Sequence, residues 1–156
     1  MENIIRLIDK ERIILLDCKS KEEVLEKLVD IFVETKIIKE KEYLLGEIQK
    51  REKVMSTGIG LGVAVPHARI DCIDDFYMAI AKLEKPIEYG SIDDRPVDLV
   101  IMIISPKGSH REYLQILATL VMFIKFKRFR EGIDKVKTKD DLYNLFNEIN
   151  NIFLSK

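Results

Sequence analysis

The sequence predicts an α/β sandwich formed by a single domain over residues 1–156. Amphipathic helical patterns lie near both ends of the chain, in residues 20–36 and 138–149. Between them, residues 97–104 are nearly all apolar and rich in β-branched side chains, which is typical of a central strand covered on both faces. A chain of 156 residues with 47% hydrophobic content is long enough to bury a sizeable core.

The first third of the chain is predicted to hold one strand between helical segments. Ser20 and Glu23 form a capping-box pattern, in which the serine accepts from the third helical N–H and the glutamate reaches back. The following apolar stripe supports a helix that stops near residue 36. The expected elements are a helical turn at 4–8, a strand at 12–17, and helices at 20–36 and 39–53.

The second half is predicted to alternate buried strands with helices. Pro86 is expected to end a strand that begins at Phe76, and Ser109 is expected to cap a helix that begins at His110. Thr138 is expected to start the final helix. The expected elements are strands at 76–83 and 97–104, and helices at 110–124, 126–136 and from 138 onward.

Composition argues against nucleic-acid binding and membrane insertion. The net charge is −1, and the basic, aromatic segment Lys125–Arg130 has its phenylalanines at helical spacing, which favours a helix with a cationic end. No apolar run approaches the roughly 18 residues of a membrane span, and the N-terminus lacks a signal-peptide pattern. The cysteines, Cys18 and Cys72, show neither metal-ligand spacing nor C-x-x-C, so we expect a reduced, cytoplasmic protein.

The segment Thr57–His67, TGIGLGVAVPH, is the strongest candidate for a functional site. Its alternating glycines allow backbone torsions in which successive N–H groups form an anion-binding concavity. Pro66 favours extended geometry before a histidine at a strand exit. A histidine with an ordinary pKa of about 6.5 is largely neutral near pH 7, so its ring can attack phosphorus. From these residues alone, His67 is equally well read as a nucleophile or as a structural polar group.

The chain resembles the fructose/mannitol/nitrogen-type IIA components (EIIA type 2) of the bacterial phosphoenolpyruvate-dependent phosphotransferase system. The resemblance lies in the following residues: Arg51-Glu52, Ser56-Thr57-Gly58-x-Gly60-x-Gly62-Val-Ala-Val-Pro66-His67, Pro86-Ile-Glu-Tyr, Arg95-Pro-Val-Asp-Leu-Val, Ser105-Pro106 and His110. It implies a mixed, about five-stranded sheet with helices on both faces. Leu61 departs from the family pattern, where asparagine is common.

The resemblance also implies a phosphoryl-transfer mechanism. His67 would accept a phosphoryl group at Nε2 from the phosphohistidine of the small carrier protein HPr, and would pass it to a IIB domain or another acceptor protein. His110, predicted in the first turn of a helix, would stabilise the phosphoryl oxygens. No cofactor or metal is required, because donor and acceptor are protein side chains. Two histidines far apart without a carboxylate at ligand spacing also argue against a metal hydrolase.

The remaining site residues have less defined roles. The expected contacts with phosphate or partner proteins are Arg51, Thr57, Gly58, Gly60, Gly62 and Arg69. Thr57 either offers its hydroxyl to phosphate or caps the loop. Ile59 and Leu61 either pack into the core or remain exposed as docking contacts.

Two roles are compatible with this chemistry. The first is a phosphoryl carrier in the uptake of fructose- or mannitol-type sugars. The second is a nitrogen-type regulatory protein whose phosphorylation state controls its binding to partner proteins.

Overall fold

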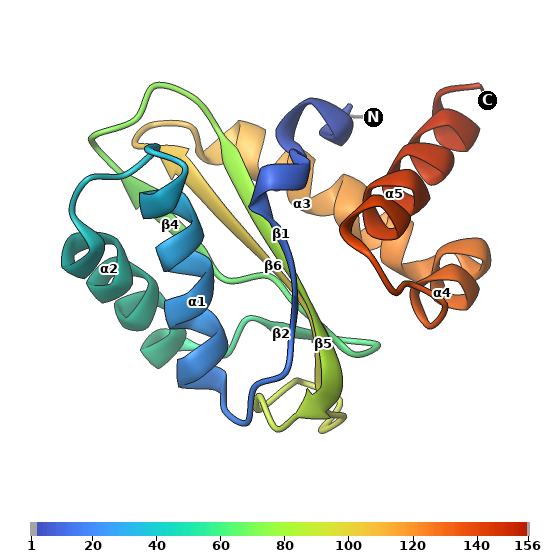
Figure 1. Cartoon of the computed structure of the whole chain (residues 1–156). Coiled ribbons are helices and arrows are strands. Elements are labelled where there is room, and N and C mark those ends of the chain that lie inside the picture. The colour runs from blue at the N-terminus through green and yellow to red at the C-terminus, as the bar shows by residue number, and fades with distance from the viewer. Residues whose placement is uncertain (1–2, 156) are drawn as a thin grey trace.

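A computed structural model of the chain, which describes residues 3–155, has three layers with a β-sheet in the middle (Figure 1). Helices α1 (Lys21–Glu34) and α2 (Lys41–Val54) cover one face of the sheet. The opposite face is covered by α3 (His110–Lys125), α4 (Lys127–Ile133), α5 (Lys139–Leu154) and the 3₁₀ helix η1 (Ile4–Leu7). A second 3₁₀ helix, η2 (Lys10–Arg12), leads into the first strand. The α/β sandwich predicted from the sequence is confirmed.

The described residues form a mixed sheet of six strands. These are β1 (Ile13–Leu16), β2 (Gly58–Gly60), β3 (Val63–Ala64), β4 (His67–Ile70), β5 (Tyr77–Ile87) and β6 (Val97–Pro106). The order is β1-β5-β6-β3-β2, and β4 also pairs with β6. Strands β1 and β5 are parallel, β5 and β6 are antiparallel, and β3 and β4 both run parallel to β6.

The sheet has six strands where about five were expected, because β3 and β4 are short strands that pair with successive parts of β6. Val63 and Ala64 lie opposite Leu99 and Val100, whereas β4 begins further along, with His67 opposite Ile103. Val65 and Pro66 separate them, and proline has no N–H to give to a ladder. The interruption places His67 at the start of a new strand.

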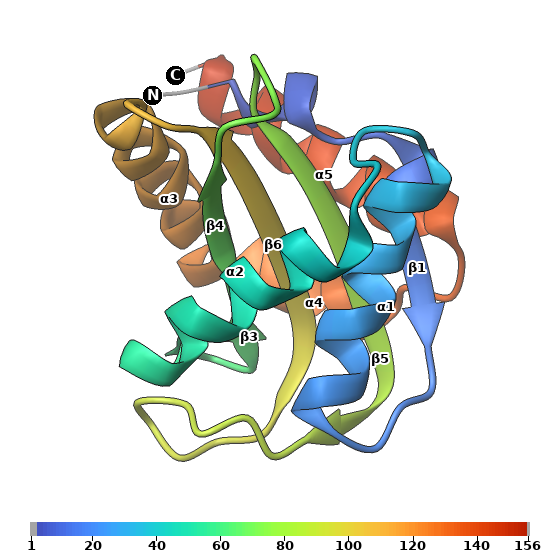
Figure 2. The ribbon, with the colours of Figure 1, turned by 90° about the vertical axis from the view of Figure 1, so that its left-hand side faces the viewer.

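The core lies on both faces of the sheet because alternate strand residues point to opposite sides. On β6, Val100, Met102 and Ile104 pack against the layer of α1 and α2, whereas Leu99, Ile101 and Ile103 pack against the other helical layer. Figure 2 shows α1 and α2 in front of the central strands, with α3, α4 and α5 behind them. The long central strands therefore form a rigid support for the shorter β4.

The expected elements are largely confirmed, with three corrections. Pro86 does not end the strand, because β5 continues to Ile87 through a register irregularity after Lys82 that omits proline from the ladder. Ser109 precedes α3 but makes no side-chain cap; its hydroxyl donates to the carbonyl of Pro106 instead. The serine cap expected at Ser20 is present, but Glu23 accepts from the N–H of Lys19 and not from that of Ser20, so the full capping box does not form there. Thr138 starts the final helix with a full capping box.

The glycine-rich segment is a tight hairpin between β2 and β3. Gly60, Leu61 and Gly62 have φ angles of 98°, 57° and 79°, so all three occupy left-handed conformations. Glycine adopts these without a steric cost, whereas leucine does not. Ile59 and Leu61 are partly buried and pack against the core layer of α3 to α5, which favours packing over exposure as their role.

Candidate functional site

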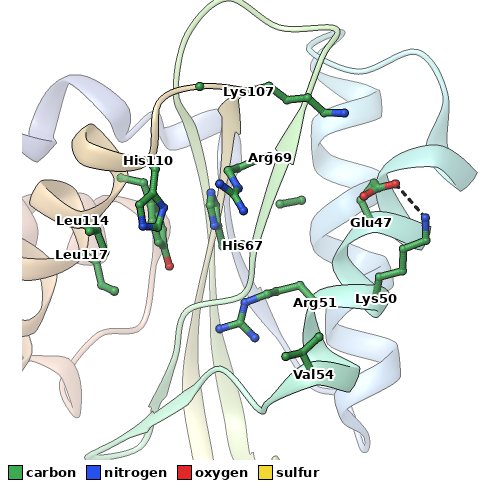
Figure 3. Close-up of a pocket in the computed structure, with 13 residues that line it drawn as sticks. Glu47, Lys50, Arg51, Val54, His67, Arg69, Lys107, His110, Leu114 and Leu117 are labelled. Carbon is green, nitrogen blue, oxygen red and sulfur yellow. Dashed lines mark hydrogen bonds and ion pairs between the residues drawn. The ribbon is translucent and has the colours of Figure 1, made fainter.

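A pocket of about 780 Å³ opens between α2 and α3, along the sheet edge formed by β4 (Figure 3). It is lined by side chains from both helical layers and from the loop before α3. The lining residues are Glu47, Lys50, Arg51, Val54, His67, Ala68, Arg69, Lys107, Gly108, His110, Tyr113, Leu114 and Leu117. The structure therefore brings together four of the predicted site residues: Arg51, His67, Arg69 and His110.

His67 lies on the pocket wall but is only 6% exposed. As the first residue of β4 it lies opposite Ile103 of β6, and its side chain projects toward the layer of α3. Two neighbours hold its ring. Nε2 lies 2.8 Å from Oγ of Ser105 on β6, and the phenol ring of Tyr113 on α3 is stacked on the imidazole, with centroids 3.7 Å apart and planes 5° apart.

The environment of His67 disfavours its protonated form. Burial, followed by the positive charges of Arg69, Arg51 and His110, lowers the pKa of His67 to about 3. The imidazole is therefore neutral throughout the physiological pH range, with a lone pair on one nitrogen. A neutral imidazole beside cations can act as a nucleophile toward an anionic group.

Cationic side chains surround the open side of the pocket. Lys50 and Arg51 come from α2, Arg69 from β4 and Lys107 from the loop before α3, and Figure 3 shows the two guanidinium groups on the side of His67 that faces α2. Arg51 also donates a hydrogen bond to the carbonyl of Met55 at 2.8 Å, which anchors it at the end of its helix. The one acidic lining residue among those described, Glu47, pairs with Lys50 at 3.3 Å. This arrangement suits an incoming phosphoryl group.

His110, the first residue of α3, also lines the pocket. Its ring centroid lies 6.4 Å from that of Tyr113, so the tyrosine is the aromatic residue that directly contacts His67. The exposed side chain of His110 is free to face a group bound at the mouth of the pocket.

Thr57, Gly58, Gly60 and Gly62 were expected at the phosphate site, but none of them lines the pocket. The N–H groups in this segment are used within the protein: that of Thr57 donates to Glu52, that of Gly58 to the Ser56 hydroxyl, and that of Leu61 to Asp93. These three N–H groups are therefore not available to an anion.

A buried hydrogen-bond network behind the site explains the position of Thr57. The side chain of Glu52 is 6% exposed. It accepts hydrogen bonds from the hydroxyl of Thr57 and, at 3.0 Å, from the hydroxyl of Tyr89. It also forms an ion pair with Lys21 at 2.7 Å. Of the two roles considered for Thr57, the structure supports a contact that fixes the loop. The network joins α1, the end of α2 and the segment that leads to the hairpin.

Ser105 and Tyr113 were missed as site residues in the sequence. Tyr113 lies on the apolar stripe of its helix and was assigned to the core, although it is three residues from His110 and therefore on the same helix face. Ser105 is a polar residue near the end of an otherwise apolar strand, and it is fully buried. A buried serine in such a strand requires a hydrogen-bond partner, and this requirement was the available signal.

Neither metal ligation nor a membrane span is indicated by the described residues. Residues 3–155 contain no cluster of three or more histidine, cysteine or acidic side chains placed to bind a metal ion. Within the same range, no helix is both long and apolar enough to cross a membrane.

Comparison with known proteins identifies the family. The family "Phosphoenolpyruvate-dependent sugar phosphotransferase system, EIIA 2" matches residues 6–149. The chain belongs to this family. A fructose-specific EIIA component from Haloferax volcanii is 28% identical over 130 residues, which cover 83% of this chain and 84% of the relative. A nitrogen regulatory protein homolog from Haemophilus influenzae is 32% identical over 119 residues, which cover 74% of this chain and 73% of the relative.

Solved EIIA structures share the fold. The nitrogen regulatory protein IIA-Ntr from Neisseria meningitidis superposes with a TM-score of 0.85 at 23% identity, over 93% of this chain and 99% of its own. A second solved structure is a complex of enzyme IIA for mannitol with phosphorylated enzyme IIB for mannitol from Escherichia coli. It matches with a TM-score of 0.75 at 21% identity, over 90% of this chain and 97% of the matched chain. EIIA proteins of this fold are thus found both with sugar-specific and with regulatory names.

Proposed function

We propose that this EIIA protein is a phosphoryl carrier that accepts a phosphoryl group from phospho-HPr on His67 and passes it to a IIB domain, in the uptake of fructose- or mannitol-type sugars. The observation that carries this proposal is a neutral, buried imidazole at the wall of an open pocket that is lined by cations. The sugar class follows the fructose-specific relative.

The charges of the pocket match the needs of phosphoryl transfer. In a loose transition state, negative charge is spread over the equatorial phosphoryl oxygens, and catalysis consists mostly of positioning and electrostatic stabilisation. Arg51, Arg69 and His110 supply fixed positive charge or N–H donors to those oxygens, and each lines the pocket. Because the pocket is open, the imidazole of a second protein can approach His67 in line with the phosphorus.

The rim of the pocket suits docking of a partner protein. Val54 and Leu114 line the pocket and are 82% and 48% exposed, and Met55, which follows Val54, is 66% exposed. Exposed apolar side chains next to a charged site are typical of a protein interface. HPr and a IIB domain would use this surface in turn, as both must reach the same histidine.

The direct test is incubation of the purified protein with phosphoenolpyruvate, Enzyme I and HPr. A phosphoryl group adds about −1.5 to −2 charges at pH 7, so native electrophoresis and intact mass both report it. We expect one acid-labile group on the wild type and none on His67→Gln, which keeps a polar side chain of similar length. Full phosphorylation of His67→Gln would overturn the assignment of His67. A wild type that stays unmodified with a cognate HPr would overturn the carrier function.

A second candidate is a regulatory role, favoured by the relative named as a nitrogen regulatory protein homolog. In this case the phosphorylation state of His67 would control binding to partner proteins other than a IIB domain. Transfer from the phosphorylated protein to a purified IIB domain separates the two roles. Loss of the phosphoryl group to IIB supports the carrier, whereas retention together with partners that distinguish His67→Asp from wild type supports regulation.

A further inference from the structure

Two residues that were not expected in the site contact His67 directly. Tyr113 covers one face of the imidazole, and Ser105 meets one of its nitrogens. They come from different layers, since Tyr113 belongs to the first turns of α3 and Ser105 to β6. The ring of His67 is thus held from the helix side and from the sheet side.

We propose that Ser105 and Tyr113 are positioning residues that hold His67 as the tautomer with the proton on Nδ1 and the lone pair on Nε2. The stacked phenol ring fixes the plane of the imidazole, because the two planes differ by only 5°. The serine hydroxyl fixes the rotation of the ring within that plane and selects the nitrogen that remains unprotonated.

The direction of the Ser105 hydrogen bond determines the tautomer. Ser105 is fully buried, and the described residues give its Oγ one hydrogen-bond partner, Nε2 of His67 at 2.8 Å. If Nε2 carried the proton, it would donate to Oγ and the buried hydroxyl hydrogen would lack an acceptor. A buried donor without a partner is strongly disfavoured. Ser105 therefore donates to Nε2, and the imidazole proton lies on Nδ1.

This arrangement leaves Nε2 as the unprotonated nitrogen, and its consequence for transfer rests on the proposed function. The Ser105 hydroxyl must first rotate away from Nε2, because its hydrogen bond occupies the lone pair that reacts. The Nε2 lone pair then forms the new N–P bond while the bond from phosphorus to the donor nitrogen breaks, and its electron pair returns to the donor. Ser105 keeps its proton and is then free to donate to a phosphoryl oxygen, and Nδ1 also keeps its proton. No other co-reactant is needed.

The first test uses nitrogen-15 NMR of His67 in the unphosphorylated protein, which reports the tautomer without any transfer reaction. We expect wild type to show protonated Nδ1 and unprotonated Nε2, and Ser105→Ala to show a mixture of both tautomers. Ser109→Ala is the matched control, because Ser109 is also buried but its hydroxyl donates to Pro106. A wild type with the proton on Nε2, or a Ser105→Ala spectrum identical to wild type, would overturn the proposal.

The second test separates the Tyr113 ring from its hydroxyl. Tyr113→Phe retains the stacked ring and should keep the tautomer and the low pKa of His67, whereas Tyr113→Leu should raise this pKa and broaden the ring signals. The charged groups around His67 stay the same in both variants, namely Glu47, Lys50 and Arg51 on α2, Arg69 on β4, and Lys107 and His110 at α3. Identical His67 spectra for Tyr113→Leu and wild type would overturn the role of Tyr113.

The rate of phosphorylation by phospho-HPr links the positioning pair to transfer. Loss of orientation should slow Ser105→Ala and Tyr113→Leu by about tenfold, with the control Ser109→Ala close to wild type. If wild type accepts no phosphoryl group, the proposed function fails, while the NMR result still decides the tautomer. If wild type accepts it and Ser105→Ala and Tyr113→Leu react as fast as Ser109→Ala, the positioning role fails alone.

Discussion

Arg69 lies two residues after His67 on β4, so the two side chains project from the same face of the strand. The guanidinium is exposed at the pocket, whereas the imidazole is buried beside it. After burial, Arg69 is the largest cause of the lowered pKa of His67. The strand geometry thus places a positive charge beside the imidazole and so affects the protonation state of its ring.

Protein stability should depend on pH through His67. The pKa is about 3 in the folded protein and about 6.5 in the unfolded chain, so the unfolded state binds more protons between these values. The free energy of unfolding should be unaffected by this residue above about pH 6.5 and should fall as the pH decreases toward 3, by at most about 1.4 kcal/mol per pH unit. Urea unfolding at several pH values measures it. His67→Gln should lack this dependence, and parallel curves for the two proteins would contradict the prediction.

Removal of the arginine charges should change both pKa and transfer rate. In Arg69→Gln the pKa of His67 should rise, more than in Arg51→Gln, because Arg69 is the stronger of the two causes. Either change should slow phosphorylation by about tenfold, since each removes a charge from the exposed side of the transition state. Lys50→Gln, which removes a cation paired with Glu47, is the control. A slowing of equal size in Lys50→Gln would indicate general attraction of the partner instead.

Two glycine substitutions should have opposite effects on stability. In Gly58→Ala the added Cβ would lie 2.4 Å from Oγ and 2.9 Å from Cα of Ser91, so backbone must shift, and we expect a loss of about 1–3 kcal/mol. Gly46 lies in α2 with no atom within 4 Å of an added Cβ, and Gly46→Ala should add about 0.5–1 kcal/mol. Denaturant titration of both variants checks the pair, and a neutral Gly58→Ala would show that the hairpin is mobile there.

Glu52 should matter for stability rather than for chemistry. Glu52→Gln leaves Lys21 without its ion pair and Tyr89 and Thr57 with a weaker acceptor, so we expect a loss of about 2 kcal/mol. Glu47→Gln, in an exposed pair with Lys50, should change stability by less than about 1 kcal/mol. Thermal unfolding compares the two. Equal effects would mean that the network around Glu52 adds no more than a surface pair.

The sequence allowed most elements to be predicted because their signals are local. The cap at Ser20, the capping box at Thr138 and the apolar run of β6 each depend on residues close together in the chain. Pro86 was misjudged because a proline can remain in a strand where the ladder is irregular, and this depends on the partner strand.

The candidate site was predictable only in part, for the same reason. His67, His110, Arg51 and Arg69 were found through motif and position, and all four line one pocket. The glycines resembled an anion-binding loop, but their torsions serve a hairpin whose N–H groups bond to Asp93 and other side chains. Ser105 and Tyr113 contact His67 only because the fold brings β6 and α3 next to it. These contacts join residues far apart in the chain, so no local sequence pattern predicts them.

The pairing of β4 with the long strand β6 has a consequence for the thermodynamics of transfer. A reacting group on a paired strand loses its conformational freedom when the chain folds, not when a partner arrives. In the proposed transfer, this chain would therefore need little further ordering at the activation step. The temperature dependence of the second-order rate should therefore yield an activation entropy with little contribution from ordering of the His67 segment beyond the loss of free tumbling on association.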